Sequence, residues 1–149
     1  MNPPLAITLP SRRPLLSVWS VCSLLDCDSA DVTKKIEDGT LPFAWDIHSS
    51  RSTKRHVRIL ARSVAEIQSN GKASAKASLS AVIDSILPHS RERFRACELA
   101  RFFSCDLCHM THLVREGSLC EIGKRKHTNQ TRIVTRASVI KFLTARRML

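Results

Sequence analysis

The residues most suggestive of chemistry are the run CDLCH at 105–109, followed directly by Met110. The C-x-x-C-H spacing is that of covalent attachment of a c-type haem, and a methionine can supply a second iron ligand. Zinc is a second candidate, because His112, Cys120 and His127 lie nearby and a C-x2-C pair with later Cys or His residues is a general zinc pattern. Haem attachment normally follows export, and the N-terminal residues do not resemble a signal peptide, which disfavours haem.

The chain repeats itself, and the repeat changes the interpretation of this motif. Residues 24–41, LLDCDSADVTKKIEDGTL, align without a gap with residues 102–119, FFSCDLCHMTHLVREGSL. In the first copy, Ala30 and Asp31 replace the second cysteine and the histidine of the motif. The feature that both copies share is therefore a fold, and Cys105 is predicted to be a small buried residue in a turn.

Each copy has the pattern of two short helices joined by a tight turn. Ser17 can cap a first helix, and Asp28 or Ser29 can cap a second one. Gly39 and Gly117 predict the ends of the second helices, where the backbone often adopts a left-handed conformation that favours glycine. The positions expected to face inward on these helices are apolar in both copies: Val32 and Ile36 in the first, and Met110, Leu113 and Val114 in the second.

A short apolar segment, a basic polar loop and a second β-branched segment follow each glycine. The loops are HSSRSTKR at 48–55 and KRKHTNQ at 124–130. This pattern predicts a two-stranded wing whose basic tip suits phosphate oxygens. A final helix follows in each copy, with Arg58 aligned over Arg132 and Arg62 over Arg136. The offset between the two copies is 78 residues in the helical segments and 74 residues at these arginines, so the alignment shifts by four residues between the two regions.

These residues resemble the MerR-like and excisionase-like winged helix-turn-helix proteins, in two tandem copies. The resemblance rests on IEDGTL with VRILAR in the first copy and on VREGSL with TRIVTR in the second. It implies an α+β, mostly helical chain with winged helix-turn-helix domains at 15–68 and 94–149, joined by a linker at 69–93 that carries a short helix. This helix is expected to pack on a neighbouring domain; alternatively, it or the C-terminus forms a homodimer.

The charge of the chain indicates a polyanionic partner. Lys and Arg number 24 against 13 Asp and Glu, a formal net charge of +11, and the sequence pI is near 10.1. No apolar run approaches the ~20 residues that span a bilayer, so double-stranded DNA is expected rather than a membrane. A cytoplasmic, nucleoid-associated location follows. Neither an enzyme activity nor a cofactor is expected, since no phosphate loop, nucleophile elbow or catalytic carboxylate pair is present.

The expected function is sequence-specific binding of double-stranded DNA by a repressor-like transcription regulator. Alternatives are an excisionase-like accessory factor that bends DNA in site-specific recombination and, more remotely, a zinc-binding interaction module. The candidate base-reading residues are on the outward faces of the second helices: Ser29, Thr33 and Lys34, and His109, Thr111, His112 and Arg115. The candidate phosphate-contacting residues are in the wings and beside them: Arg51, Lys54, Arg55, Arg58, Arg62, Lys124, Arg125, Lys126, Asn129, Arg132 and Arg136.

Overall fold

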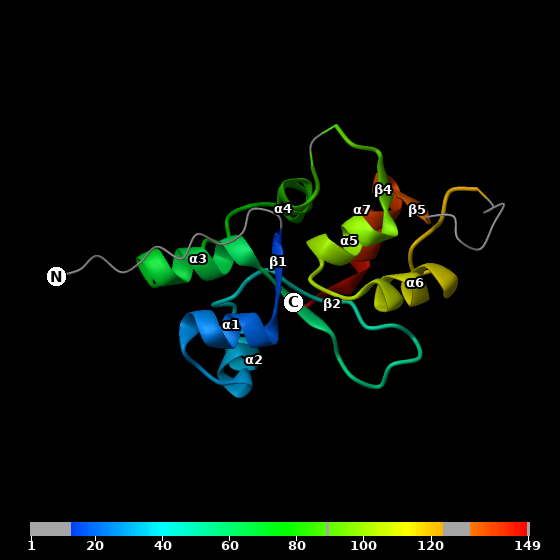
Figure 1. Ribbon diagram of the computed structural model, residues 1–149. Coiled ribbons are helices and arrows are strands. Elements are labelled where there is room, and N and C mark those ends of the chain that lie inside the picture. Colours follow the sequence, from blue (N-terminus) through cyan, green and yellow to red (C-terminus); the bar gives the residue numbers. More distant parts are fainter. Residues whose placement is uncertain (1–12, 89, 124–131, 149) are drawn as a thin grey trace.

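A computed structural model describes residues 13–88, 90–123 and 132–148 (Figure 1). Over these residues the chain is an α+β protein with seven helices and short antiparallel strands. In chain order the elements are β1 (Leu15–Ser17), α1 (Val18–Leu25), α2 (Ser29–Glu37), β2 (Ala44–Asp46), β3 (Val57–Leu60), α3 (Ala61–Asn70), α4 (Leu79–Ile86), β4 (Arg93–Arg95), α5 (Ala96–Phe102), α6 (Leu107–Arg115), β5 (Ile133–Thr135), α7 (Arg136–Arg146) and β6 (Arg147–Met148). Within the described ranges, every helix is too short or too polar to span a lipid bilayer.

The first half of the chain, β1 to α3, and the second half, β4 to α7, repeat one order of elements. Each has a strand, two helices, a return strand and a third helix, and the first half has in addition β2 between α2 and β3. β1 pairs antiparallel with β3, and β4 pairs antiparallel with β5. In both halves the third helix is joined to the residue before the first strand: the N–H of Ala61 donates to the carbonyl of Pro14, and that of Arg136 donates to Glu92, both at 2.8 Å. The repeat in the sequence is thus a repeat of backbone structure.

The strand pairing changes one detail of the sequence alignment. Leu16 lies opposite Ile59 in the first half, and Phe94 lies opposite Val134 in the second, with all four side chains buried. Equivalent residues of the two copies are therefore 78 positions apart in the first strand and 75 positions apart in the return strand. The alignment of the two copies shifts by three residues between these strands, and not by the four that the sequence alignment gave. A shift of one residue would turn every strand side chain to the other face, so the buried residues determine the register. The arginines that the sequence alignment matched are not equivalent.

Local signals account for the helix boundaries. The side chains of Ser17, Asp28 and Asp106 accept hydrogen bonds from the first turns of α1, α2 and α6. The predicted caps at Ser17 and Asp28 are confirmed. Gly39 and Gly117 follow α2 and α6 at φ of 82° and 84°, a conformation in which a side chain would be strained.

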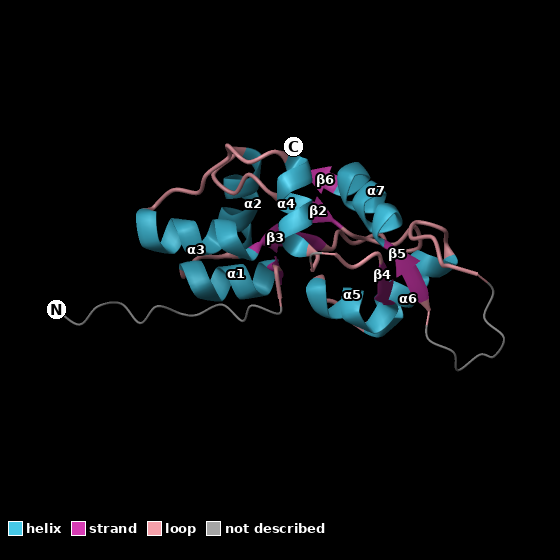
Figure 2. Ribbon diagram, turned by 90° about the horizontal axis from the view of Figure 1, so that it is seen from above, coloured by secondary structure: helices cyan, strands magenta, loops and turns pink. Residues whose placement is uncertain are grey.

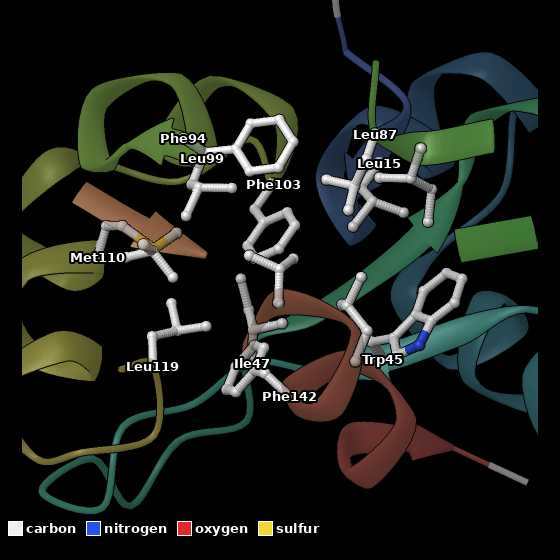
Figure 3. Close-up of a cluster of buried hydrophobic side chains, with 14 of the residues drawn as sticks. Leu15, Trp45, Ile47, Leu87, Phe94, Leu99, Phe103, Met110, Leu119 and Phe142 are labelled. Carbon is white, nitrogen blue, oxygen red and sulfur yellow. The ribbon is translucent and has the colours of Figure 1, made fainter. Parts of the chain in front are cut away.

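The two halves share one hydrophobic core, part of which is shown in Figure 3. Its members from the first half are Leu15, Phe43, Trp45, Ile47 and Leu60, and those from the second half include Phe94, Leu99, Phe103, Met110, Leu113 and Phe142. Val82, Ile83 and Ile86 of α4 belong to the same core, so the apolar face of this helix packs within the chain. That packing uses the surface that a dimer through α4 would need.

The C-terminal strand also crosses between the halves. β6 pairs with β2, and the two strands lie side by side in Figure 2. The first sheet therefore has the strand order β1-β3-β2-β6. β6 lies within the range 94–149 that was predicted from the sequence to be the second domain, and it forms the edge of the sheet of the first half. The first half also has a smaller core of its own, built around Val21, Val32, Ile36, Ile59 and Val64.

Arg58 joins the halves by hydrogen bonds. Its Nε donates to the carbonyl of Phe103 at 2.7 Å, and its Nη2 donates to the carbonyl of Ser104 at 3.2 Å. The hydroxyl of Ser104 in turn donates to the carbonyl of Leu15 at 2.6 Å. The turn between α5 and α6 is therefore hydrogen-bonded to both β1 and β3. Among the described residues, Arg58 is the only donor to the carbonyls of Phe103 and Ser104.

We expect Arg58→Ala to lower the free energy of unfolding by about 2–3 kcal/mol, because it leaves two partly buried carbonyls without their charged donor. Arg62→Ala is the matched control, since the Arg62 side chain is 74% exposed and, among the described residues, forms an ion pair with Glu66 alone, at the surface and at 3.3 Å. That control should change the value by about 0.5 kcal/mol or less. Urea denaturation measures both, and equal losses would contradict a joining role for Arg58.

Candidate nucleic-acid interface

α2 presents a polar face to solvent. Val32 and Ile36 are buried at 0% and 5% exposure, whereas Ser29, Thr33 and Lys34 are exposed, as the helical spacing predicts. The Thr33 hydroxyl donates its hydrogen to the carbonyl of Ser29 at 3.0 Å, so its oxygen can still accept a hydrogen bond. Together these three residues offer both hydrogen-bond donors and acceptors on one helix face.

α6 has a similar division, with its polar residues toward its C-terminal end. Its inward residues, Met110, Leu113 and Val114, are buried in the shared core. His112 and Arg115 are exposed, and Thr111 is half-buried. These three remain on the side of the helix that faces away from the core.

His109 differs from the sequence prediction, which placed it on the outward face of the same helix. Its Nε2 donates to the carbonyl of Ile47 at 2.5 Å, and its ring stacks on that of His56 with centroids 4.5 Å apart. Both partners belong to the connection between β2 and β3, residues 47–56, which we call the first wing loop. His109 thus lies half-buried between the two halves and is not displayed on the outward face.

The first wing loop lies against α6, as Figure 1 shows. The backbone N–H and the hydroxyl of Ser50 both donate to Oε2 of Glu116, at 2.8 and 2.5 Å. Arg51, Lys54 and Arg55 on the same loop are exposed. No local sequence signal could reveal this contact, because Ser50 and Glu116 are 66 residues apart.

Three arginines predicted to contact phosphate are used inside the fold. Arg58 binds the carbonyls described above. Arg132 forms an ion pair with Glu121 at 2.6 Å, and Arg136 forms one with Asp84 at 3.0 Å. The Arg132 and Arg136 side chains are only 10% and 12% exposed. The predicted contacts in the second wing, Lys124, Arg125, Lys126 and Asn129, lie outside the described residues.

The cysteine motif that opened the sequence analysis is divided between a turn and a helix. Cys105 is half-buried in the turn, and burial raises the pKa of its thiol to about 11, which opposes formation of the thiolate that metals bind. Cys108 is exposed on α6. Within the described ranges, no three Cys, His, Asp or Glu side chains gather to hold a metal ion, and His127 lies outside those ranges.

Two surface hollows collect the exposed basic residues. The first lies between the first wing loop and α6 and is lined by Arg51, His112, Arg115 and Glu116. The second lies beside α2, and its polar lining is Thr33, Glu37, Asp46, His48, Arg55, Arg146 and Arg147, so three arginines face two carboxylates. The first wing loop therefore contributes one arginine to the hollow beside α6 and another to the hollow beside α2. Each predicted reading helix faces a basic hollow completed by the same loop.

The contact between His56 and His109 predicts a pH dependence of stability. Burial, and then the neighbouring charges of His109 and Arg58, lower the pKa of His56 in the folded state. The folded state thus disfavours the protonated ring, so its contribution to stability is complete above the unfolded pKa of about 6.5. This contribution decreases below that value and is lost as the pH falls through the lower pKa of the folded state.

We therefore expect the free energy of unfolding to fall more between pH 7.5 and 5.5 in the unaltered chain than in His56→Gln, which cannot titrate. Urea denaturation at a series of pH values measures this difference. Because the comparison subtracts the titration of all other groups, parallel pH profiles for the two proteins would contradict the assignment to His56.

No model of a known protein family matches the chain, and no curated protein or solved structure matches it. The geometry of these two helices and of the loop between them is therefore the ground for a functional conclusion.

Proposed function

We propose that the chain binds double-stranded DNA in a sequence-specific manner and acts as a repressor-like transcription regulator. The observation that carries this proposal is the placement of the polar faces of α2 and α6 beside basic hollows that share the first wing loop. An α-helix fits the major groove, where polar side chains can reach base edges, and adjacent cations can bind the backbone phosphates. The net charge of +11 adds long-range attraction to the duplex.

The exposed residues divide into two roles. In this proposal base edges are read by side chains of the two helices: Ser29, Thr33 and Lys34 on α2, and Thr111 and His112 on α6. Arg115, in the last turn of α6, lies beside the first wing loop instead. Phosphates are bound by exposed cations of the first wing loop: Arg51, Lys54 and Arg55. Arg58, Arg132 and Arg136 are left out because their guanidinium groups hold the fold together, and His109 is left out because it contacts the wing loop.

The two helix faces differ in chemistry, so one chain is expected to select an asymmetric site. Selection of bound fragments from a random duplex library should yield one non-palindromic sequence. Affinity for it should fall roughly a thousandfold between 50 and 200 mM salt if about six phosphates are contacted. Fluorescence anisotropy measures this dependence. Failure to enrich any sequence would overturn the proposal, and a large bend in the bound duplex would favour the accessory factor of recombination instead.

His112→Ala should weaken discrimination at one base pair of the selected site by about 1–3 kcal/mol, because a base contact carries sequence information. Lys72→Ala serves as the control, since Lys72 is exposed on the connection between α3 and α4 and lines neither hollow. Competition binding against single-base variants of the site measures the change. An equal loss of affinity for every variant would assign His112 to the phosphate backbone rather than to a base.

A further inference from the structure

The hollow beside α6 is built from both halves of the chain. Ser50 is held to Glu116 by two hydrogen bonds, from its backbone N–H and from its hydroxyl. The loop is fixed again at Ile47, whose carbonyl accepts from His109, and at His56, whose ring stacks on the same histidine. The backbone of Arg51, next to Ser50, therefore has a defined position relative to α6.

Two arginines that line this hollow have guanidinium groups without a hydrogen-bond partner among the described residues. Neither Arg51 nor Arg115 makes a hydrogen bond or an ion pair with any described residue, in contrast to Arg58, Arg132 and Arg136. One comes from the first wing loop and the other from the last turn of α6. Two unpaired guanidinium groups beside one hollow can donate to the several oxygens of a single phosphate group.

Glu116 also lines the hollow, and its carboxylate is occupied. Ser50 donates to Oε2 through two groups, and the hydroxyl of Ser118 donates to Oε1 at 2.8 Å. Burial alone would raise the pKa of Glu116, but these hydrogen bonds lower it below its usual value, so the group is ionised at neutral pH. Two arginines and one carboxylate leave a net charge of +1, with the carboxylate oxygens engaged by serines.

We propose that this hollow binds one phosphate of the DNA backbone between Arg51 and Arg115. The inference rests on the proposed function and deepens it: the first wing loop is a phosphate-binding element for the reading helix of the other half. Glu116 acts as a positioning residue that holds Ser50, and hence Arg51, beside Arg115. The two halves would then bind a duplex as one surface of fixed geometry.

The test measures affinity for a mixed-sequence duplex of about 30 base pairs between 50 and 200 mM salt. Arg51→Ala and Arg115→Ala should each weaken binding by about five- to tenfold, and Lys72→Ala should weaken it less than twofold. If both arginines contact one phosphate, the double variant should lower the slope of log K against log salt by about 0.9. A decrease of about 1.8 would show two separate phosphates and overturn the shared site.

The Glu116→Ala variant distinguishes a phosphate site that Glu116 positions from non-specific electrostatic attraction to DNA. This variant gains a positive unit of net charge, so non-specific electrostatics predicts tighter binding. Release of Ser50 and Arg51 predicts binding at least threefold weaker, with thermal unfolding followed as a check on the fold. Tighter binding by Glu116→Ala would overturn the proposal.

The outcomes also separate this inference from the function on which it rests. An unaltered chain that binds no duplex would overturn both. If the unaltered chain binds DNA and the double arginine variant binds it equally well, the phosphate site alone would be overturned.

Inorganic phosphate titrated at up to 10 mM, with NMR detection of the Arg51 and Arg115 side chains, should bind weakly and compete with the duplex. Tight phosphate binding without any competition would assign the hollow to a free anion and overturn the proposal.

Discussion

The burial of first-half side chains against the second half is the interaction on which the other features depend. Trp45 lies in β2, with Phe43 directly before the strand and Ile47 directly after it, and all three are at most 2% exposed because the shared core covers them. Burial of each such side chain contributes about 1.5–3 kcal/mol, so separation of the halves would be costly. The shared core fixes α6 relative to the first sheet, and thereby allows the first wing loop to reach α6.

This packing changes how two reading helices in one chain would act. Two domains on a flexible linker gain affinity through effective concentration, and they tolerate variable spacing between their sites. Here α4 packs into the common core, and β6 completes the sheet of the first half. The distance between α2 and α6 is therefore set by the fold, and a bound duplex would have to match it or bend toward it.

Those parts of the fold that arise from neighbours in the chain could be predicted from the sequence. The caps at Ser17 and Asp28 and the ends of the second helices at Gly39 and Gly117 follow from residue type and spacing. The inward positions of α2 and α6 follow from helical periodicity.

Contacts between distant residues could not be predicted in this way. The sequence offers equivalent-looking arginines, but it does not show that Arg58 donates to two carbonyls of the other half while Arg51 makes no hydrogen bond or ion pair with a described residue. The strand register was missed for a related reason. Identical arginines suggested one alignment, whereas burial of Ile59 and Val134, which depends on the whole core, selected another.

The differences between the two copies are explained by the same packing. Lys35 on α2 and Leu113 on α6 occupy equivalent positions, yet Lys35 is half-exposed and Leu113 is fully buried. The buried residues of α2 belong to the smaller core, whereas those of α6 belong to the core that both halves share, and the buried face of α6 is the wider one.

The third position of each second helix shows a corresponding change. In α2 it is Asp31, whose side chain accepts from the backbone N–H of Asp28 and closes a capping box at 3.4 Å. In α6 it is His109, whose side chain turns instead to Ile47 of the first wing loop. The Cys108-His109 pair that resembles a haem or zinc motif is thus placed where the second copy must contact the first. Its histidine has a role in packing the two halves, and this role exists only because the repeat is folded as one body.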